Sequence, residues 1–166
     1  MIKLIHILII SATLWGGYLF SQCQRPSQVI SPDYKDGWGE NSQSKSGHLR
    51  PGDHYEMRFI AQAGIKYRIK ATAGSNEFSE DNISFQLVVK EVNHIEKDGK
   101  VTYKSSEVIL YDSELAGEGE EAIILTSKAQ SLSIKVKIDD VNVPAFTTLC
   151  AIVLIEAKKA KIEGLK

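Results

Sequence analysis

The chain has 166 residues, of which 43% are hydrophobic and 25% are charged, so it is long enough for one domain with a hydrophobic core. It carries 20 Lys and Arg residues against 21 Asp and Glu residues, which gives a formal net charge of −1. This near-neutral balance argues against nucleic acid as a partner, because binding to phosphates needs clustered excess positive charge.

The first segment of the chain has the pattern of a secretory signal peptide. Lys3 precedes an uncharged, mostly apolar run from Leu4 to Phe20, and the chain turns polar at Ser21. We therefore expect an exported protein, in the periplasm or at the cell surface. Cleavage after Ser21 is favoured over acylation of Cys23, because the bulky Gln22 precedes that cysteine, and over an uncleaved anchor, because the apolar run is short. Membrane contact is expected only through the leader or a lipid on Cys23.

Residues 22–47 are rich in Pro, Gly, Ser and Asn and have little apolar periodicity, so they are expected to form an extended polar lead-in without elements of its own. Tyr34 and Trp38 are the residues expected to dock it on the body of the protein. An exposed Trp can also be a platform for a sugar, but packing of the lead-in is the favoured role because large aromatic side chains mostly bury area.

The chain has two cysteines, Cys23 and Cys150. In an exported protein, two cysteines invite a disulfide. Cys150 lies in an apolar run that resembles a buried strand, so a buried free thiol is the alternative. Whether Cys23 reaches the body depends on the path of the lead-in, and both readings stay open.

From about residue 48 the sequence becomes a succession of predicted strands. Residues 54–61 alternate between apolar and polar side chains, and residues 66–72 alternate again as the second arm of a hairpin. Further strands are predicted at 83–92, 108–111, 122–126, 132–138 and 149–156. Asp98-Gly99 marks another hairpin turn, with arms at 92–95 and 101–103. The run at 149–156 is almost continuously apolar, which favours a central strand covered on both faces.

Seven to eight strands without a convincing amphipathic helix predict an all-β fold, an antiparallel β-sandwich of jelly-roll-like type. The expected organisation is a signal peptide at 1–21, the lead-in at 22–47, the sandwich at 48–158 and a basic C-terminal tail at 159–166. The polar stretches 73–82, 114–121 and 139–147 are expected to be loops.

Short motifs follow one another along the body: Ser44–Gly47, Pro51–Glu56, Gly64–Ile69, Ile83–Leu87, Val108–Asp112, Leu132–Val136 and Cys150–Ile155. Their order resembles that in a family of small exported proteins, without an assigned activity, from gliding and type IX-secreting bacteria. The layout is also similar to the bacterial pre-peptidase C-terminal domain, a jelly-roll-like accessory module. The resemblance implies export and a sandwich fold, and no catalytic residue. Family members often carry a cysteine after the Tyr-Arg-Ile strand, where this chain has Ala71 and Ala73, which leaves Cys23 as the partner for Cys150.

Catalytic and metal-binding motifs were not found: H-E-x-x-H, G-x-S-x-G, the P-loop and C-x-x-C are missing from the sequence. His48, His54 and His94 have no spacing that suits a zinc site, and each is expected to be exposed to solvent. No metal ion or cofactor is therefore predicted.

Two groups of acidic loop residues have the oxygen atoms that Ca²⁺ prefers, but neither has the spacing of a calcium loop, so plain solvated charge is favoured. The groups are Asp139 and Asp140 with Asn142, and Glu118, Glu120 and Glu121.

Three function classes follow from these observations. The preferred one is a non-catalytic exported module that binds a protein or a cell-envelope partner. The first alternative is a carbohydrate-binding module that uses Trp38, Tyr34, Tyr103 and Tyr111, and it requires at least two of these rings to be exposed on one surface. The second alternative is an uncharacterised hydrolase, and it requires a pocket in which a histidine meets Ser, Asp or Glu within hydrogen-bond reach.

Overall fold

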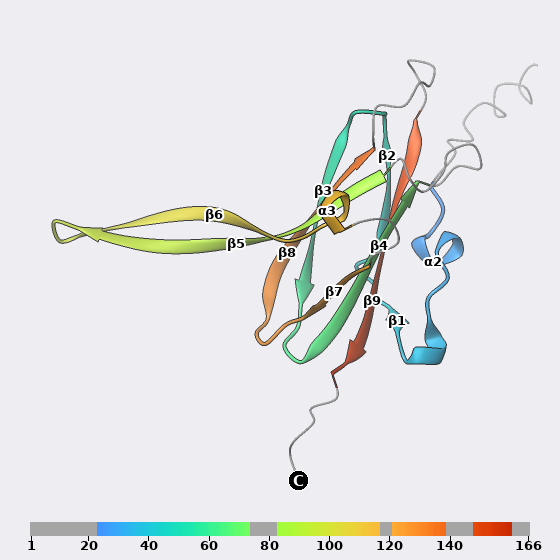
Figure 1. Ribbon diagram of the computed structural model, residues 1–166, viewed down its shortest axis with the longest axis horizontal. Helices are drawn as coiled ribbons and strands as arrows, with labels where there is room; N and C mark the ends of the chain where they lie inside the picture. The colour runs from blue at the N-terminus through green and yellow to red at the C-terminus, as the bar shows by residue number, and fades with distance from the viewer. Residues whose placement is uncertain (1–22, 74–82, 117–120, 139–147, 161–166) are drawn as a thin grey trace, which may run out of the picture.

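The computed structural model describes residues 23–73, 83–116, 121–138 and 148–160. The described chain is an all-β protein in which two antiparallel sheets pack face to face (Figure 1). The first sheet contains β1 (Gly39–Glu40), β2 (Lys45–Leu49), β9 (Leu149–Lys159), β4 (Ile65–Ala73) and β7 (Ala122–Leu125). The second contains β3 (His54–Ala61), β8 (Gln130–Ile138), β5 (Ile83–Lys97) and β6 (Lys100–Asp112). Three short helices accompany them: α2 (Pro26–Val29), η1 (Tyr34–Asp36) and α3 (Ser113–Ala116).

The strand pairing is nested. β2 pairs with β9, β3 with β8, β4 with β7 and β5 with β6, always antiparallel. In the sequence, each of these pairs therefore encloses the pair named after it. Successive pairs alternate between the two sheets, and the sheets are completed where β9 meets β4 and β8 meets β5. The sandwich therefore corresponds to one long antiparallel hairpin that is folded into two sheets.

The core between the sheets follows from the period-two alternation of the sequence. On β3 the side chains of Met57 and Phe59 are buried, while their neighbours along the strand are exposed. On β8, Ile134 faces the same core, and the ring of Phe59 meets the edge of Tyr67 from β4 at 5.5 Å. Each fully buried Ile or Phe contributes about 1.5–3 kcal/mol relative to exposure, so this layer supplies the main stabilisation.

The prediction that the last strand is central and covered on both faces is confirmed. β9 pairs with β1 and β2 on one side and with β4 on the other. Its outward side chains Ile152 and Leu154 are as fully buried as the inward Val153, and the lead-in packs against β9 through α2 (Figure 1). A strand buried on both faces reads as a continuous apolar run rather than an alternation.

Two expectations about elements were wrong. The described residues form nine strands rather than seven or eight, because the lead-in contributes β1 and the start of β2 as well as α2 and η1. The chain in this region has no apolar alternation because it adds edge strands to β9, and backbone pairing there does not require a buried face. The second error concerns the predicted loop at 114–121, whose first residues belong to the single turn of α3.

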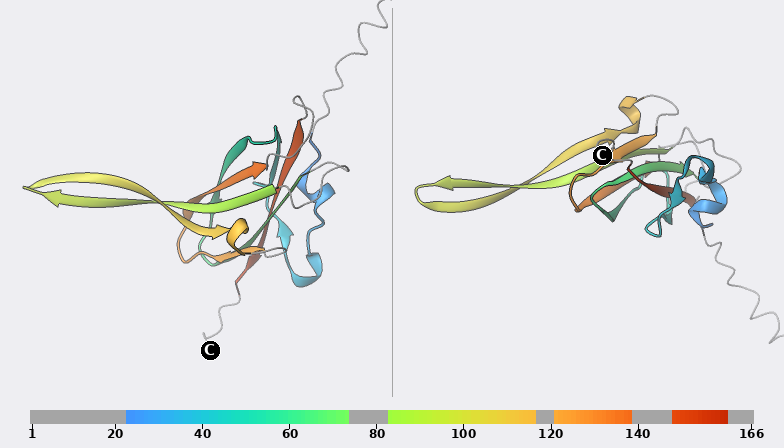
Figure 2. Two further views of the ribbon diagram at one scale, coloured as in Figure 1. Left: turned by 45° about the horizontal axis from the view of Figure 1, so that its top comes forward. Right: turned by 90° about the horizontal axis from the view of Figure 1, so that it is seen from below.

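β5 and β6 extend beyond the sandwich as a two-stranded arm (Figure 2). β5 pairs with β8 only as far as Val89, and a bulge between Leu87 and Val88 interrupts its register with β6. The arm is closed by Asp98 and Gly99, whose φ angles of +53° and +70° are those of the tight hairpin turn that their sequence predicts. The separate short strands predicted at 92–95, 101–103 and 108–111 are parts of these two long strands.

Candidate functional site

The lead-in covers the outer face of the first sheet over β4 and β9. Gly37 adopts a φ of +77° after η1 and turns the chain so that Trp38 lies against β4 and β9. The Trp38 ring, 4% exposed, is contacted by the Arg68 guanidinium at 4.6 Å and the Lys158 ammonium at 4.2 Å from its centre. These cation–π contacts fix the lead-in on the sheet.

A buried ion pair lies next to that ring. Arg68 donates two hydrogen bonds to the carboxylate of Glu156, from Nε at 2.6 Å and from Nη2 at 2.8 Å, and the carboxylate is fully buried. The backbone N–H of Asp33 in the lead-in donates to the same carboxylate at 2.9 Å. Glu121 and Lys70 complete the network, 2.9 Å apart. The network therefore joins the lead-in to β4 and β9.

Two ionisation equilibria in this network are shifted. Burial alone would raise the pKa of Glu156, but the hydrogen bonds from Arg68 and from the Asp33 backbone outweigh burial and lower it below 4.5. The hydrogen bonds to Glu156 raise the pKa of Arg68. Both groups are thus held in their charged forms, as expected of a structural ion pair.

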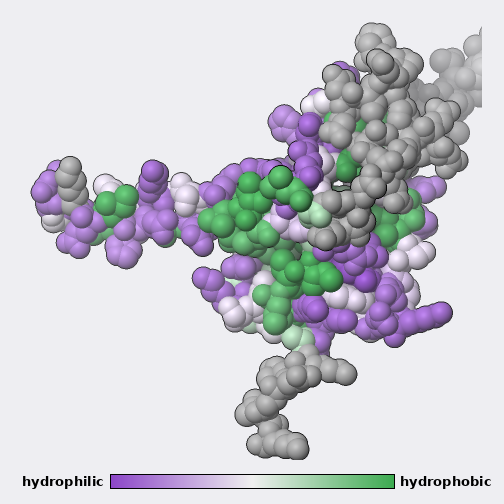
Figure 3. Space-filling view, viewed as in Figure 1, coloured by the Kyte–Doolittle hydropathy of each residue, from purple (hydrophilic) through white to green (hydrophobic). Residues whose placement is uncertain are grey.

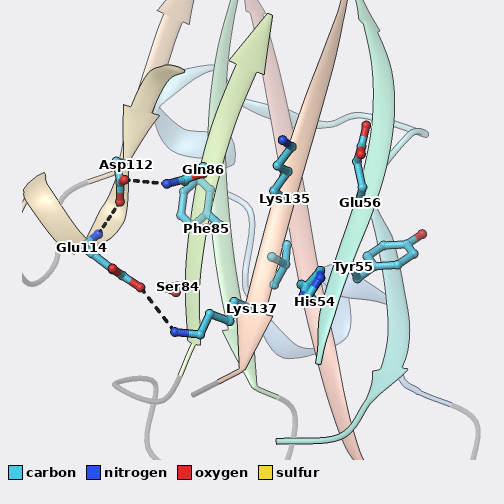
Figure 4. A pocket seen from close by; sticks show the side chains of 11 residues that line it. His54, Tyr55, Glu56, Ser84, Phe85, Gln86, Asp112, Glu114, Lys135 and Lys137 are labelled. Carbon is cyan, nitrogen blue, oxygen red and sulfur yellow. Dashed lines mark hydrogen bonds and ion pairs between the residues drawn. The ribbon is translucent and has the colours of Figure 1, made fainter. Parts of the chain in front are cut away.

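The outer face of the second sheet is open and polar. Strand register places Glu56, Lys135, Gln86 and Asp112 in one row across β3, β8, β5 and β6 (Figure 4). Together with the neighbouring row, these residues line a shallow cavity of about 370 Å³. Gln86 Nε2 donates to Asp112 at 2.7 Å. Within this row, Glu56 and Lys135 carry opposite charges on neighbouring strands and attract one another, and the neutral Gln86 separates Lys135 from Asp112.

Hydrogen bonds between strands hold these charges in place. Ser133 Oγ donates to Glu56 at 2.9 Å, and this bond is the main cause of the lowered pKa of Glu56. Lys135 Nζ donates to Glu107 at 2.5 Å, which lowers the pKa of Glu107 and raises that of Lys135. The shifts therefore stabilise the ordinary ionised forms of Glu56, Glu107 and Lys135.

The cavity brings one histidine and one serine to the same surface without pairing them. His54 lines it, and so does Ser84, but Lys137 on β8 lies between them as the register partner of both. Two strand spacings separate His54 from Ser84, about 9.6 Å, which is beyond hydrogen-bond reach. Among the described residues, no hydrogen bond joins His54 to a serine or a carboxylate.

The four candidate sugar-binding rings do not share a surface. Trp38 is buried beneath the lead-in, and Tyr34 is 66% exposed on η1. Tyr103 is 76% exposed but lies far out on β6, whereas Tyr111 packs against Phe85 at 5.2 Å between ring centres. The two exposed rings come from different ends of the fold, so they form no common platform. Trp38 docks the lead-in as expected, and Tyr34 does not.

Sequence reasoning missed an apolar area at the side of the sandwich. Figure 3 shows apolar side chains gathered over the root of the arm and across β7. Five residues, each between 44% and 86% exposed, come from β6, α3 and β7: Ile109, Leu110, Leu115, Ile123 and Leu125. We call these five residues the apolar side. β6 and β7 are the edge strands of their sheets within the described residues, so both also present unpaired backbone groups.

The two cysteines meet at the start of β9, next to β2. Cys23 and Cys150 form a disulfide, with their Cα atoms 5.5 Å apart. His48 on β2 lies beside it, although its position in the sequence gave no indication of this contact.

Several predicted features lie outside the described residues. These are the leader at 1–21, Glu118 and Glu120, the group Asp139, Asp140 and Asn142, and the tail beyond Ala160. Glu121 is described, and it pairs with Lys70 and Arg68. Lys159, assigned to the tail, is the last residue of β9.

Comparison with known proteins gives no family assignment, since no protein-family model and no curated protein matches the chain. Among the described residues, no helix has the length and apolar character to cross a membrane.

Proposed function

We propose that this protein is a non-catalytic exported module that binds a partner protein through its apolar side. The observation that carries the proposal is the contrast between the surfaces of the sandwich. The lead-in covers one outer face over β4 and β9, the cavity on the other outer face is lined mainly by polar residues, and the apolar side leaves five large aliphatic side chains in water. Contiguous exposed apolar area of this kind marks interaction sites on soluble proteins.

The chemistry of the apolar side favours a protein over a polysaccharide. Leu115 and Leu125 are 86% and 62% exposed and offer no hydrogen-bonding groups to a sugar. The edges of β6 and β7 offer backbone N–H and C=O groups, which an extended segment of another protein can pair with. Aliphatic side chains next to a free strand edge suit a partner that adds a strand and packs its own apolar side chains against them.

Export is part of the proposal and has independent support. The leader has the order of charge, apolar run and polar exit found in signal peptides. A disulfide is usual in proteins that fold in an oxidising compartment. The nested pairing that alternates between two sheets supports the jelly-roll-like assignment.

The interaction is tested by photocrosslinking in the native host. A photoreactive amino acid at Leu125 is compared with one at Ile60, which is 53% exposed on β3, at the opposite edge of its sheet from β6. We expect one discrete protein adduct from Leu125, its loss in an Ile123→Lys background, and none from Ile60. Equal adducts at both positions, or none at either, would refute the proposed surface.

Export is tested separately by cell fractionation and intact-mass measurement. The expected product is an envelope or secreted protein that begins at Gln22 and carries oxidised cysteines. A cytoplasmic protein with its N-terminus intact would contradict export without bearing on the apolar side.

A further inference from the structure

A second site lies where the lead-in, β2 and β9 meet. His48 and Cys150 are register partners in the β2–β9 ladder, so their side chains leave the sheet on the same face. Cys23 approaches the same point from the start of the lead-in. His48 Nδ1 lies 3.5 Å from the sulfur of Cys23 and 4.0 Å from that of Cys150, and the three atoms are all within 4.8 Å of one another.

These separations are similar to the distances between neighbouring ligand atoms around one metal ion. With metal–sulfur bonds of about 2.3 Å and metal–nitrogen bonds of about 2.0 Å, nitrogen and sulfur ligands of one ion lie about 3.5–3.8 Å apart. The two nitrogen–sulfur distances are already close to that range. Only the sulfur atoms must separate, and neither is held in the interior, since both cysteines are half-buried and His48 is exposed.

The polar contacts of the His48 ring also indicate a site built around sulfur. Within the described part of the chain, the polar contacts of its ring are those to the two cysteine sulfurs. A disulfide does not need an imidazole beside it. Two thiolates and one imidazole are, by contrast, a ligand set that thiophilic d¹⁰ cations prefer over oxygen ligands.

We propose that the reduced form of this protein binds a thiophilic d¹⁰ cation, such as Zn²⁺, through Cys23, Cys150 and His48. The disulfide first accepts two electrons and two protons from a dithiol, which becomes a disulfide, and two protein thiols result. Each thiol then loses its proton as the cation binds, so one Zn²⁺ displaces two protons. Solvent reaches the exposed side of the site and supplies the fourth ligand.

The site therefore has two alternative states, one closed by a sulfur–sulfur bond and one closed by a metal ion. Both join the start of the lead-in to β9, so the lead-in stays attached in either state. This inference does not depend on the apolar side or on its partner.

The experiment uses the purified protein, reduced with a phosphine under anaerobic conditions, with far-UV circular dichroism to follow the fold. Titration with Co²⁺ is expected to give one equivalent of sulfur-to-cobalt charge-transfer absorption and visible bands of a tetrahedral site. Zn²⁺ is expected to displace the Co²⁺. The oxidised protein is expected to give neither signal.

His48→Ala is expected to weaken Zn²⁺ binding, measured against a chromogenic chelator, by at least tenfold. The matched control is His54→Ala, which removes another exposed histidine on the second sheet and is expected to leave binding unchanged. Three results would overturn the proposal: no thiolate–cobalt absorption in the reduced protein, equal affinity of the His48→Ala and parent proteins, or loss of the β signal on reduction that Zn²⁺ does not restore.

Discussion

Removal of Arg68 is the sharpest test of how the lead-in is held. In Arg68→Met the carboxylate of Glu156 stays fully buried but loses both hydrogen bonds from the guanidinium. Breaking a buried pair on one side costs about 3–5 kcal/mol, because an uncompensated charge remains. The Asp33 backbone N–H at 2.9 Å and Lys70 at 3.8 Å still face Glu156, so we expect the lower end, about 3 kcal/mol.

Urea unfolding followed by tryptophan fluorescence measures this change. The chain has two tryptophans, Trp15 and Trp38, and Trp38 lies next to Arg68, so a protein expressed from Gln22 onward reports on the site of the substitution alone. A loss of about 3 kcal/mol lowers the urea midpoint by about 1.5 M for a domain of this size.

The matched control replaces both partners, Arg68→Met with Glu156→Leu. This double variant removes the buried charge as well, so it is expected to be more stable than Arg68→Met alone. A midpoint of Arg68→Met equal to that of the parent protein would refute the reasoning, and so would a double variant less stable than the single one.

Three further predictions concern other parts of the fold. Because the pKa of Glu156 is lowered in the folded state, its stabilisation is fully present above about pH 4.5 and is lost as the pH falls through the folded-state value; the difference in unfolding free energy between the parent and Glu156→Gln should therefore shrink on acidification. Cys150→Ser opens a loop of 127 residues and should cost up to about 5 kcal/mol in a thermal or urea melt, and a change below about 1 kcal/mol would contradict this. On the arm, Tyr103→Ala should change the unfolding free energy by less than about 0.5 kcal/mol, because the ring is 76% exposed, whereas Leu132→Ala in the core should cost about 2–5 kcal/mol.

The strands of the core were predictable from the sequence because their faces differ in polarity. Met57 and Phe59 on β3 and Ile134 on β8 alternate with charged or polar residues, and each is buried as expected. β2 could not be predicted in this way. Its sequence, Lys45 to Leu49, has one buried residue at its end, and its conformation is set by pairing with β9, about a hundred residues away in the chain.

The surface features depend on register, which a single sequence does not reveal. Lys135 is recognisable as an outward residue of its strand, but nothing local indicates that Glu56 and Gln86 stand on either side of it. His48 shows the same difficulty, since its neighbour Cys150 is known only once β2 is paired with β9. The apolar side was equally hidden, because the sequence predicts a strand at 122–126 without indicating that this strand lies at the edge of a sheet with Ile123 and Leu125 exposed.

The nested pairing bears on when the chain is able to fold. β2 and β4 both need β9, the last of the described strands, before the first sheet is complete, and β3 needs β8. Contacts between such distant segments form late, after the entropy of closing long loops has been overcome. In the export that we propose, a chain that enters a translocation channel amino end first would stay unfolded until β9 has crossed. Delayed folding of this kind would keep the polypeptide threadable during passage and would defer its compaction to the far side of the membrane.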